Sequence, residues 1–411
     1  MSKISLKHSG GNVVSLNSPT NAPSTADVAF KLPNADGSDG QAIVTDGSGN
    51  LSFGSVAATR NLIINGAMQV AQRGTSSTSS GYQTVDRFNH GGGGWDAALT
   101  QSQVDVASGT TPYTSGFRKA FKITNGNQSS GLGSGDSFYI ETSIEAQNLA
   151  TSGWNYTSSS SYITISFWIK SSVAQNFYGY LKTQDGTSQR YPYETGTLSA
   201  DTWTKITKTI PGNSNITIDN NNGAGLYWEM IWLSGTDYTD SGVTLNQWGA
   251  FASGTRTPDS TATWFTTNAA TLEITGVQLE VGSTATDFEH RSYGDELLKC
   301  QRYYEHSYNT GIAVGANSNV GGYYENLTSD NGNNAPFSIE YKVQKRAVPS
   351  LAFYADDGTA NQWSYGRNGA NGQTSVTGHR NSQTHCNGYI GVGAAWVACY
   401  AAGHWTSSSE L

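Results

Sequence analysis

The chain has 411 residues and carries 23 Lys and Arg against 31 Asp and Glu, so its formal net charge is −8. Charged residues make up only 13% of the chain, whereas it contains 48 Gly, 22 Tyr, 13 Phe and 11 Trp. This composition excludes an all-helical protein, because strand and turn formers dominate it, and the absence of a Lys/Arg cluster argues against a nucleic-acid partner.

The first 57 residues predict an extended arm. Two Asp-Gly-Ser turn signals occur at 36–38 and 46–48, and the second separates the short apolar runs 41–45 and 50–53. Asp-Gly between β-prone runs favours a hairpin, because glycine adopts positive φ without a steric cost. The segment is too small and too polar to bury a core of its own. Residues 1–57 are therefore expected to be an attachment arm that orders against another chain.

Residues 58–292 predict the short strands of a jelly-roll-like β-sandwich. The run 162–171 places four apolar residues on one face, namely Ile163, Ile165, Phe167 and Ile169. This alternation is typical of a half-buried strand, and 177–182, 226–233 and 272–281 show it too. Gly276 shifts the phase of the last run, as a β-bulge would. Short strands joined by Gly, Ser, Asn and Thr loops favour an all-β sandwich.

Helical signal is limited to about one turn near 144–149 and to residues 293–305. The second helix is expected to be a linker between the sandwich and a C-terminal β-sandwich domain at 306–411. In that domain four apolar residues alternate with polar ones, namely Phe337, Ile339, Tyr341 and Val343. Residues 389–402 are expected to form one strand with a face of small residues. That face either packs in the core of one subunit or approaches a symmetry axis.

The sequence contains no recognised pattern for catalysis or metal binding. It has no Gly-x-Ser-x-Gly nucleophile motif. Four C-terminal residues lack the spacing of a zinc site, namely His379, His385, Cys386 and His404. The Asp residues at 356–357 and at 237 and 240 lie in turn-like contexts, where aspartate is a turn former. We therefore expect no catalytic residue, no metal and no cofactor, and hence no enzyme.

The chain also lacks the signals of export. No N-terminal apolar run predicts a secretory signal, and no stretch approaches the roughly 20 apolar residues of a membrane-spanning helix. Its 3 cysteines are too few and too scattered for a disulfide framework. We expect synthesis in a reducing cytoplasm without membrane insertion.

Aromatic side chains are the best candidates for ligand binding. The candidates are Tyr162, Trp168, Tyr178, Tyr180, Tyr193 and Trp95. The first four lie opposite the aliphatic residues on two consecutive predicted strands, Tyr193 follows a short turn, and Trp95 follows a glycine run on a mobile loop. Because the apolar faces of sugars stack on flat rings, these residues are expected to form a glycan platform. A second buried layer and a subunit interface are the alternatives.

Several segments resemble proteins of bacteriophage tail fibres and virion appendages. The similar segments are 61–74 (NLIINGAMQVAQRG), 165–170, 202–205, 274–283 (ITGVQLEVGS), 288–293 and 300–304, with 32–37 and 40–47 in the arm. The central module resembles carbohydrate-binding sandwiches of the galactose-binding-like, jelly-roll type. Such relatives often hold Ca²⁺ with carboxylates, but the matching positions 65–69 and 276–278 have none here, which argues against a calcium site.

The resemblance implies a trimeric tail fibre that recognises a host-surface polysaccharide. Its N-terminal arm would attach to the phage tail or an adaptor protein, and the chain would be made in the host cytoplasm and end in the virion. The polar arm, the short helix at 293–305 and the small-residue face at 389–402 also favour a homotrimer. Three alternatives are a capsid-attached fibre or decoration protein, a glycan depolymerase and an unrelated cellular carbohydrate-binding module.

Overall fold

A computed structural model describes residues 3–7, 10–11, 13–17, 31–33, 36, 41–45, 49–55, 60–327, 334–367, 370–391 and 399–411. The chain divides into two compact units, residues 1–59 and 60–411. Antiparallel strands are the main regular structure of both units, which confirms the predicted all-β class. In the described ranges, no helix combines the length and the apolar character needed to cross a membrane.

The first unit contains two hairpins. Strand β1 (Lys3–Lys7) pairs with β2 (Val13–Asn17), and β3 (Gln41–Thr45) pairs with β4 (Leu51–Ser55). The second pair confirms the hairpin predicted around the Asp-Gly-Ser signal at 46–48. The other signal, at 36–38, lies almost entirely outside the described residues. Ile43 is 60% exposed on its strand, so this hairpin leaves apolar surface uncovered.

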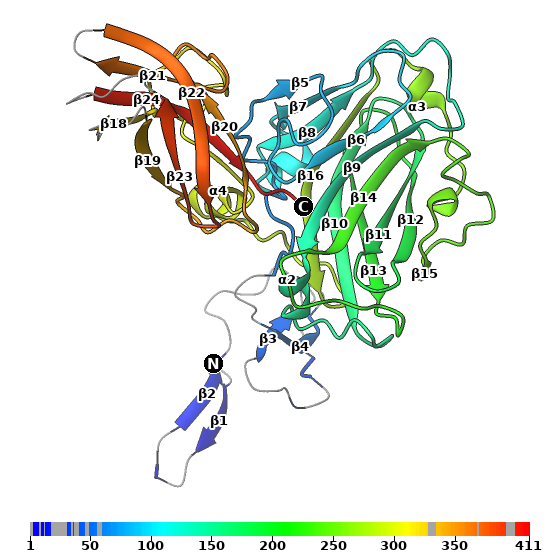
Figure 1. Ribbon diagram of the computed structural model, residues 1–411. Helices are drawn as coiled ribbons and strands as arrows, with labels where there is room; N and C mark the ends of the chain where they lie inside the picture. The colour runs from blue at the N-terminus through cyan, green and yellow to red at the C-terminus, as the bar shows by residue number, and fades with distance from the viewer. Residues whose placement is uncertain are drawn as a thin grey trace. The chain divides into compact units, whose positions relative to one another are not determined.

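The second unit begins with a sandwich of two antiparallel sheets (Figure 1). The first sheet consists, in spatial order, of β13 (Thr204–Pro211), β10 (Tyr162–Ser171), β16 (Thr271–Val281), β8 (Lys119–Thr124), β7 (Thr100–Asp105) and β5 (Ser76–Ser77). The second consists of β15 (Gly249–Ala250), β12 (Gln189–Thr197), β11 (Asn176–Thr183), β14 (Ala224–Ser234), β9 (Ser137–Glu145) and β6 (Asn89–Gly93). These strands include every run in which alternation predicted one.

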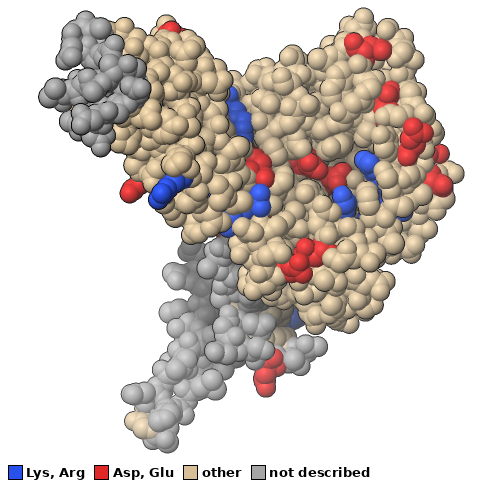
Figure 2. Space-filling model, viewed as in Figure 1, with Lys and Arg blue, Asp and Glu red and all other residues tan. Residues whose placement is uncertain are grey.

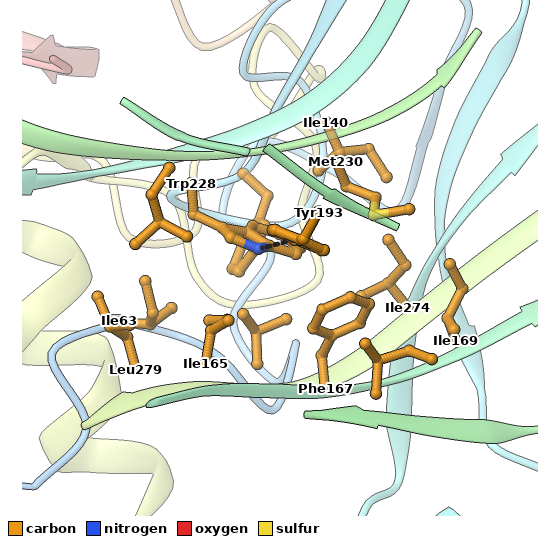
Figure 3. Packing of buried hydrophobic residues seen from close by; sticks show 14 of the residues in the cluster. Ile63, Ile140, Ile165, Phe167, Ile169, Tyr193, Trp228, Met230, Ile274 and Leu279 are labelled. Carbon is orange, nitrogen blue, oxygen red and sulfur yellow. Dashed lines mark hydrogen bonds between the residues drawn. The ribbon is translucent and has the colours of Figure 1, made fainter. Parts of the chain in front are cut away.

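The core lies between the two sheets. The four apolar residues of the predicted strand face, from Ile163 to Ile169, are fully buried on β10. Figure 3 shows Phe167 pointing toward Trp228 of β14, and their ring centroids are 5.3 Å apart. Each such buried side chain contributes about 1.5–3 kcal/mol relative to an exposed one. The aliphatic face predicted from the sequence is therefore the core face.

A β-bulge interrupts the pairing of β10 with β16, as the sequence predicts. Ser166 pairs with Gln278 and Trp168 pairs with Thr275, so one residue of β10 faces two residues of β16. Gly276 lies in the bulge with φ +65°, a conformation that favours glycine. A Cβ atom at this position would lie 2.6 Å from the ring of Phe117. The glycine is thus required both by the backbone and by its neighbour.

Helices are few and short. Those predicted from the sequence are α2 (Ala146–Ala150) and α4 (Tyr293–Gln301), whereas α1 (Thr111–Thr114), α3 (Thr263–Thr266) and the 3₁₀ turn Ser253–Thr255 were not predicted. Ser292 caps α4 by accepting a hydrogen bond of 3.2 Å from the backbone N–H of Asp295. The prediction that this helix reaches residue 305 is wrong, because β17 (Tyr304–His306) pairs with a C-terminal strand instead.

The C-terminal part of this unit is a second β structure with its own core. Its other strands are β18 (Tyr323–Leu327), β19 (Asn334–Glu340), β20 (Ser350–Tyr354), β21 (Gln362–Arg367), β22 (Ala370–Asn381), β23 (His385–Gly391) and β24 (Cys399–Ser408). The sheet order is β17-β24-β21-β22-β23-β19, and β18 and β20 also pair with β24. Phe337 and Ile339 are buried on β19, which confirms the first half of the predicted alternation, whereas Tyr341 and Val343 follow the end of this strand.

The prediction of a single strand at 389–402 is wrong. Residues up to Gly391 end β23, which pairs with β19 and β22, whereas Cys399 begins β24, which pairs with four other strands. Residues 392–398 lie outside the described residues, and so does half of the proposed small-residue face. A period of two cannot distinguish one long strand from two strands with different partners.

A buried ion network, which we call the junction network, links the sandwich to the last residues of the chain. Arg87 is 1% exposed and pairs with the carboxylate of Glu410. It also donates to the backbone carbonyl of Ser143 at 2.9 Å, and its guanidinium lies 3.5 Å from the ring centre of Tyr303. Arg73 reaches the same Glu410 carboxylate at 3.0 Å. The carboxylate thus has two guanidinium partners.

Candidate functional site

The aromatic residues predicted to form one platform lie on different surfaces. Tyr162 and Trp168 are on β10 in the first sheet, whereas Tyr178 and Tyr180 are on β11 in the second sheet. The short connection between these strands passes from one layer of the sandwich to the other. Because the outer faces of a sandwich point in opposite directions, the predicted four-residue platform does not exist.

Two further candidates belong to the core. Tyr193 is fully buried, and the indole N–H of Trp228 donates to its hydroxyl at 2.7 Å. Burial raises the pKa of Tyr193 far above its ordinary value. Trp95 is half-buried, with its ring centroid 5.6 Å from that of Phe138, so it packs against the core and is not on a free loop. Neither side chain is therefore on the exposed platform that the sequence predicted.

The outer face of the second sheet presents a different aromatic surface. Tyr139, Tyr178 and Tyr227 occupy the strand positions that alternate with core residues, and each is half-buried. Ile231 pairs with Tyr178 on one side and with Tyr139 on the other, so one row crosses three strands. We call this surface the tyrosine face. Burial raises the pKa of all three hydroxyls, that of Tyr139 to about 12.

A row of polar residues crosses the middle of the tyrosine face. Tyr180 pairs with Glu229, Glu229 with Glu141, and Glu141 with Asn89. The Tyr180 hydroxyl donates to the Glu229 carboxylate, and the Asn89 amide donates to the Glu141 carboxylate at 2.6 Å. Burial, assisted by the neighbouring Glu141, raises the pKa of Glu229 to about 7. Burial also raises the pKa of Glu141.

Basic side chains surround these carboxylates. The Lys182 amine lies 5.4 Å from the ring centre of Tyr227 and 4.5 Å from that of Phe251. The guanidinium of Arg256 lies over the ring of Tyr238 at 4.4 Å, and its charge opposes the rise in the pKa of Glu229. Figure 2 shows acidic and basic side chains close together in the middle of the view, over the second sheet.

A separate groove lies at the edge of the second sheet formed by β12 and β15. It has a volume of about 370 Å³, and its lining includes Arg190, Asp240, Trp248 and Thr255. Arg190 bonds the hydroxyl of Thr255 at 3.4 Å, which draws the loop after β15 toward the sheet. Aromatic rings, cations and carboxylates therefore gather on the outer side of the second sheet, although Tyr180 and Glu229 are themselves buried there. Such a surface can stack sugar rings and bond their hydroxyls.

Sequence reasoning missed the two glutamates and two of the three tyrosines of this face. The alternation in 226–233 places Tyr227 and Glu229 opposite the core residue Trp228. That signal was visible in the sequence. Nothing in the sequence, however, indicates that Glu141 lies beside Glu229, because the two positions meet only through the pairing of β9 with β14.

The C-terminal histidines and cysteine do not converge. Cys386 is buried in the second core, and His385 bonds Ser382 in its own turn. His404 accepts from or donates to Ser307 at one ring nitrogen and bonds the Ser318 carbonyl with the other, so no carboxylate orients it as in a hydrolytic triad. Among the described residues, no group of three or more His, Cys, Asp or Glu could hold a metal ion.

The predicted turn role is confirmed for two of the four aspartates, whereas the Asp237 carboxylate accepts from the distant Ser134 hydroxyl at 3.3 Å. Asp240 accepts from the N–H of Gly242 at 2.7 Å, and Asp357 accepts from the N–H of Thr359 at 2.9 Å. Both are side-chain turns that span two residues.

No protein-family model matches the chain, and none of the curated proteins matches it. Similar solved structures include the enzymatically active domain of tailspike protein 4 of bacteriophage CBA120 (10% identity, TM-score 0.29), of which this chain covers 21%. They also include a putative sugar-binding protein from Bacteroides thetaiotaomicron (12%, 0.29) and the CBM22-1 xylan-binding domain of Xyn10C from Paenibacillus barcinonensis (10%, 0.27), each covered completely. The three alignments cover 54%, 54% and 56% of this chain. At these TM-scores the likeness carries no conclusion about function, and the resemblance to virion appendages stays a prediction.

Proposed function

We propose that the β-sandwich binds a glycan on the tyrosine face. The observation that carries this proposal is the group of half-buried rings of Tyr139, Tyr178 and Tyr227 on the same sheet face as the half-buried carboxylate of Glu141. Flat rings stack on the apolar faces of sugars. Carboxylates accept hydrogen bonds from sugar hydroxyls, and the neighbouring cations donate to them. We propose binding without cleavage of the glycan.

We further propose that the chain is a virion appendage, a homotrimeric tail fibre that adsorbs to a host-surface polysaccharide. The similarity of residues 61–74 and 274–304 to tail-fibre proteins supports this assignment. The arm would attach to the tail or to an adaptor protein. Leu32, which is 78% exposed, and Ile43 leave apolar surface on the arm that a partner chain would cover.

Tyr178→Ala and Tyr227→Ala are expected to weaken glycan binding at least about tenfold each, because each removes a stacking ring, and tenfold corresponds to about 1.4 kcal/mol. An array of bacterial surface polysaccharides identifies the ligand, and calorimetric titration then measures the affinities. Tyr162→Ala, on the other sheet, is the matched control and should bind as the unmodified protein does. Equal loss in all three variants would contradict the site. Release of reducing ends from the bound polysaccharide would contradict binding without cleavage and would favour a glycan depolymerase.

Two further experiments test the homotrimer and the place of the chain in the virion. Light scattering is expected to give about three times the chain mass of 43.7 kDa. Antibodies labelled with gold should mark the tails of purified phage particles. A monomer at micromolar concentration would contradict the trimer. Gold labelling of the capsid would favour the alternative, a capsid-attached fibre or decoration protein.

A further inference from the structure

A pocket opens on the outer face of the first sheet, on the opposite side of the sandwich from the tyrosine face. Its volume is about 470 Å³, within the roughly 300–1,000 Å³ of small-molecule sites. The lining residues that matter here are Phe117, Ser166, Trp168, Lys205, Phe288 and His290. They come from β10, β13, the segment before β8 and the segment after β16.

One wall of the pocket is a cluster of rings. The ring centroids of Phe117 and Phe288 are 4.8 Å apart, and that of His290 lies 4.9 Å from Phe288. The floor is kept open by the bulge glycine, Gly276, because a Cβ there would collide with Phe117. Trp168 lines the pocket beside this floor and is half-buried. The bulge with its glycine therefore also leaves room for the pocket beside the aromatic rings.

Two polar side chains of the pocket, Ser166 and Lys205, are available to a ligand, whereas His290 and Thr286 bond other described residues. Ser166 is 4% exposed, and its hydroxyl makes no hydrogen bond to the described residues. Lys205, the cross-strand partner of Trp168, is exposed and forms no ion pair with any described residue. By contrast Lys170, two positions along β10, pairs with Glu273 at 3.0 Å. A ligand in the pocket can therefore bond the Ser166 hydroxyl, which lines it.

We infer that this pocket is a second sugar-binding site, and that it takes a sugar residue carrying a carboxylate. The sugar ring stacks on Trp168, its carboxylate meets the unpaired Lys205, and one hydroxyl bonds Ser166. Asp287, the one carboxylate of the lining, accepts from a further hydroxyl. The inference extends the proposed function to a second site, and separate variants test the two.

The experiment titrates the full-length protein with galacturonate, glucuronate and sialic acid, and with galactose and glucose as neutral counterparts, by saturation-transfer NMR. At least one acidic sugar is expected to bind more tightly than the neutral ones. Lys205→Gln is expected to weaken the binding of the acidic sugar about tenfold and to leave the binding of neutral sugars unchanged. Trp168→Ala is expected to weaken the binding of both kinds of sugar. Lys208→Gln, on the same strand but outside the pocket, is the matched control.

The outcomes separate this inference from the proposed function. Weaker binding of the acidic sugar in Lys205→Gln and Trp168→Ala identifies the second site, whatever the effect of Tyr178→Ala on binding. Loss confined to Tyr178→Ala supports the tyrosine face alone and overturns the second site. Failure of all three acidic sugars to bind the unmodified protein, or unchanged binding in Lys205→Gln, also overturns it.

Discussion

Replacing Glu410 with alanine is expected to lower the free energy of unfolding by about 3–5 kcal/mol, because it leaves a buried charge without its counter-ion. Arg87 cannot lose its proton at any ordinary pH, and the sandwich and Tyr303 enclose its guanidinium. The carbonyl of Ser143 remains as an acceptor, but a carbonyl does not neutralise the charge. Arg73 loses the same partner.

Urea unfolding followed by tryptophan fluorescence measures the effect. Asp105→Ala is the matched control, because it breaks the exposed ion pair with Lys119 and should cost at most about 1 kcal/mol. The double variant Arg87→Met with Glu410→Leu should recover much of the loss, since both charges are then removed together. A cost for Glu410→Ala no larger than that of the control would show that the junction network contributes little.

The stability of the unmodified protein is expected to fall between about pH 4.5 and pH 7 through Glu229. Its pKa in the folded state, about 7, lies above the ordinary value of 4.5. The folded state therefore holds the proton more tightly, so this contribution is complete below pH 4.5 and is lost as pH rises through 7. This difference in pKa between the folded and unfolded states corresponds to about 3 kcal/mol of the free energy of unfolding. Glu229→Gln should remove the loss and be the more stable protein at pH 8.

Thermal unfolding of the two proteins at several pH values tests this expectation. Other groups titrate in the same range, because burial raises the pKa of Asp86 to about 6 and lowers those of His90 and His306 to about 4. They are present in both proteins, so the difference between the two curves reports on Glu229. Glu194→Gln, on the same sheet, controls for the loss of a carboxylate. Parallel curves for Glu229→Gln and the unmodified protein would contradict the assignment.

Local patterns in the sequence were sufficient for individual strands. Alternation defined β10 and its core face, and one glycine at 276 located the bulge, because both are properties of a single segment. The same alternation could not show that the chain changes sheets between Tyr178 and Trp168, since it says nothing about the partner of a strand. The predicted platform failed for that reason, although most of its individual strands were right.

The site and the junction network were beyond the reach of the sequence for a related reason. Glu141 and Glu229 become neighbours through strand pairing, and Arg87 meets Glu410 across 323 positions of the chain. No local period connects such residues. The resemblance to known proteins identified similar segments without their structural role. Asn61 shows one such role, because its amide bonds the backbone of Val277 and Leu279 and so fastens the start of the sandwich to β16.

The position of β24 in its sheet has a consequence for the order in which the protein can be built. This strand joins β17, β18, β20 and β21, yet it follows all of them in sequence. During synthesis from the N-terminus, those four strands leave the ribosome before the strand that connects them exists. The sandwich, whose strands all precede residue 282, can fold meanwhile, as domains generally do. In the C-terminal sheet, β19, β21, β22 and β23 can also pair with one another before β24 exists. Strands β17, β18 and β20 have no strand partner but β24 among the described residues, so they must wait with their edges open to other nascent copies of the chain.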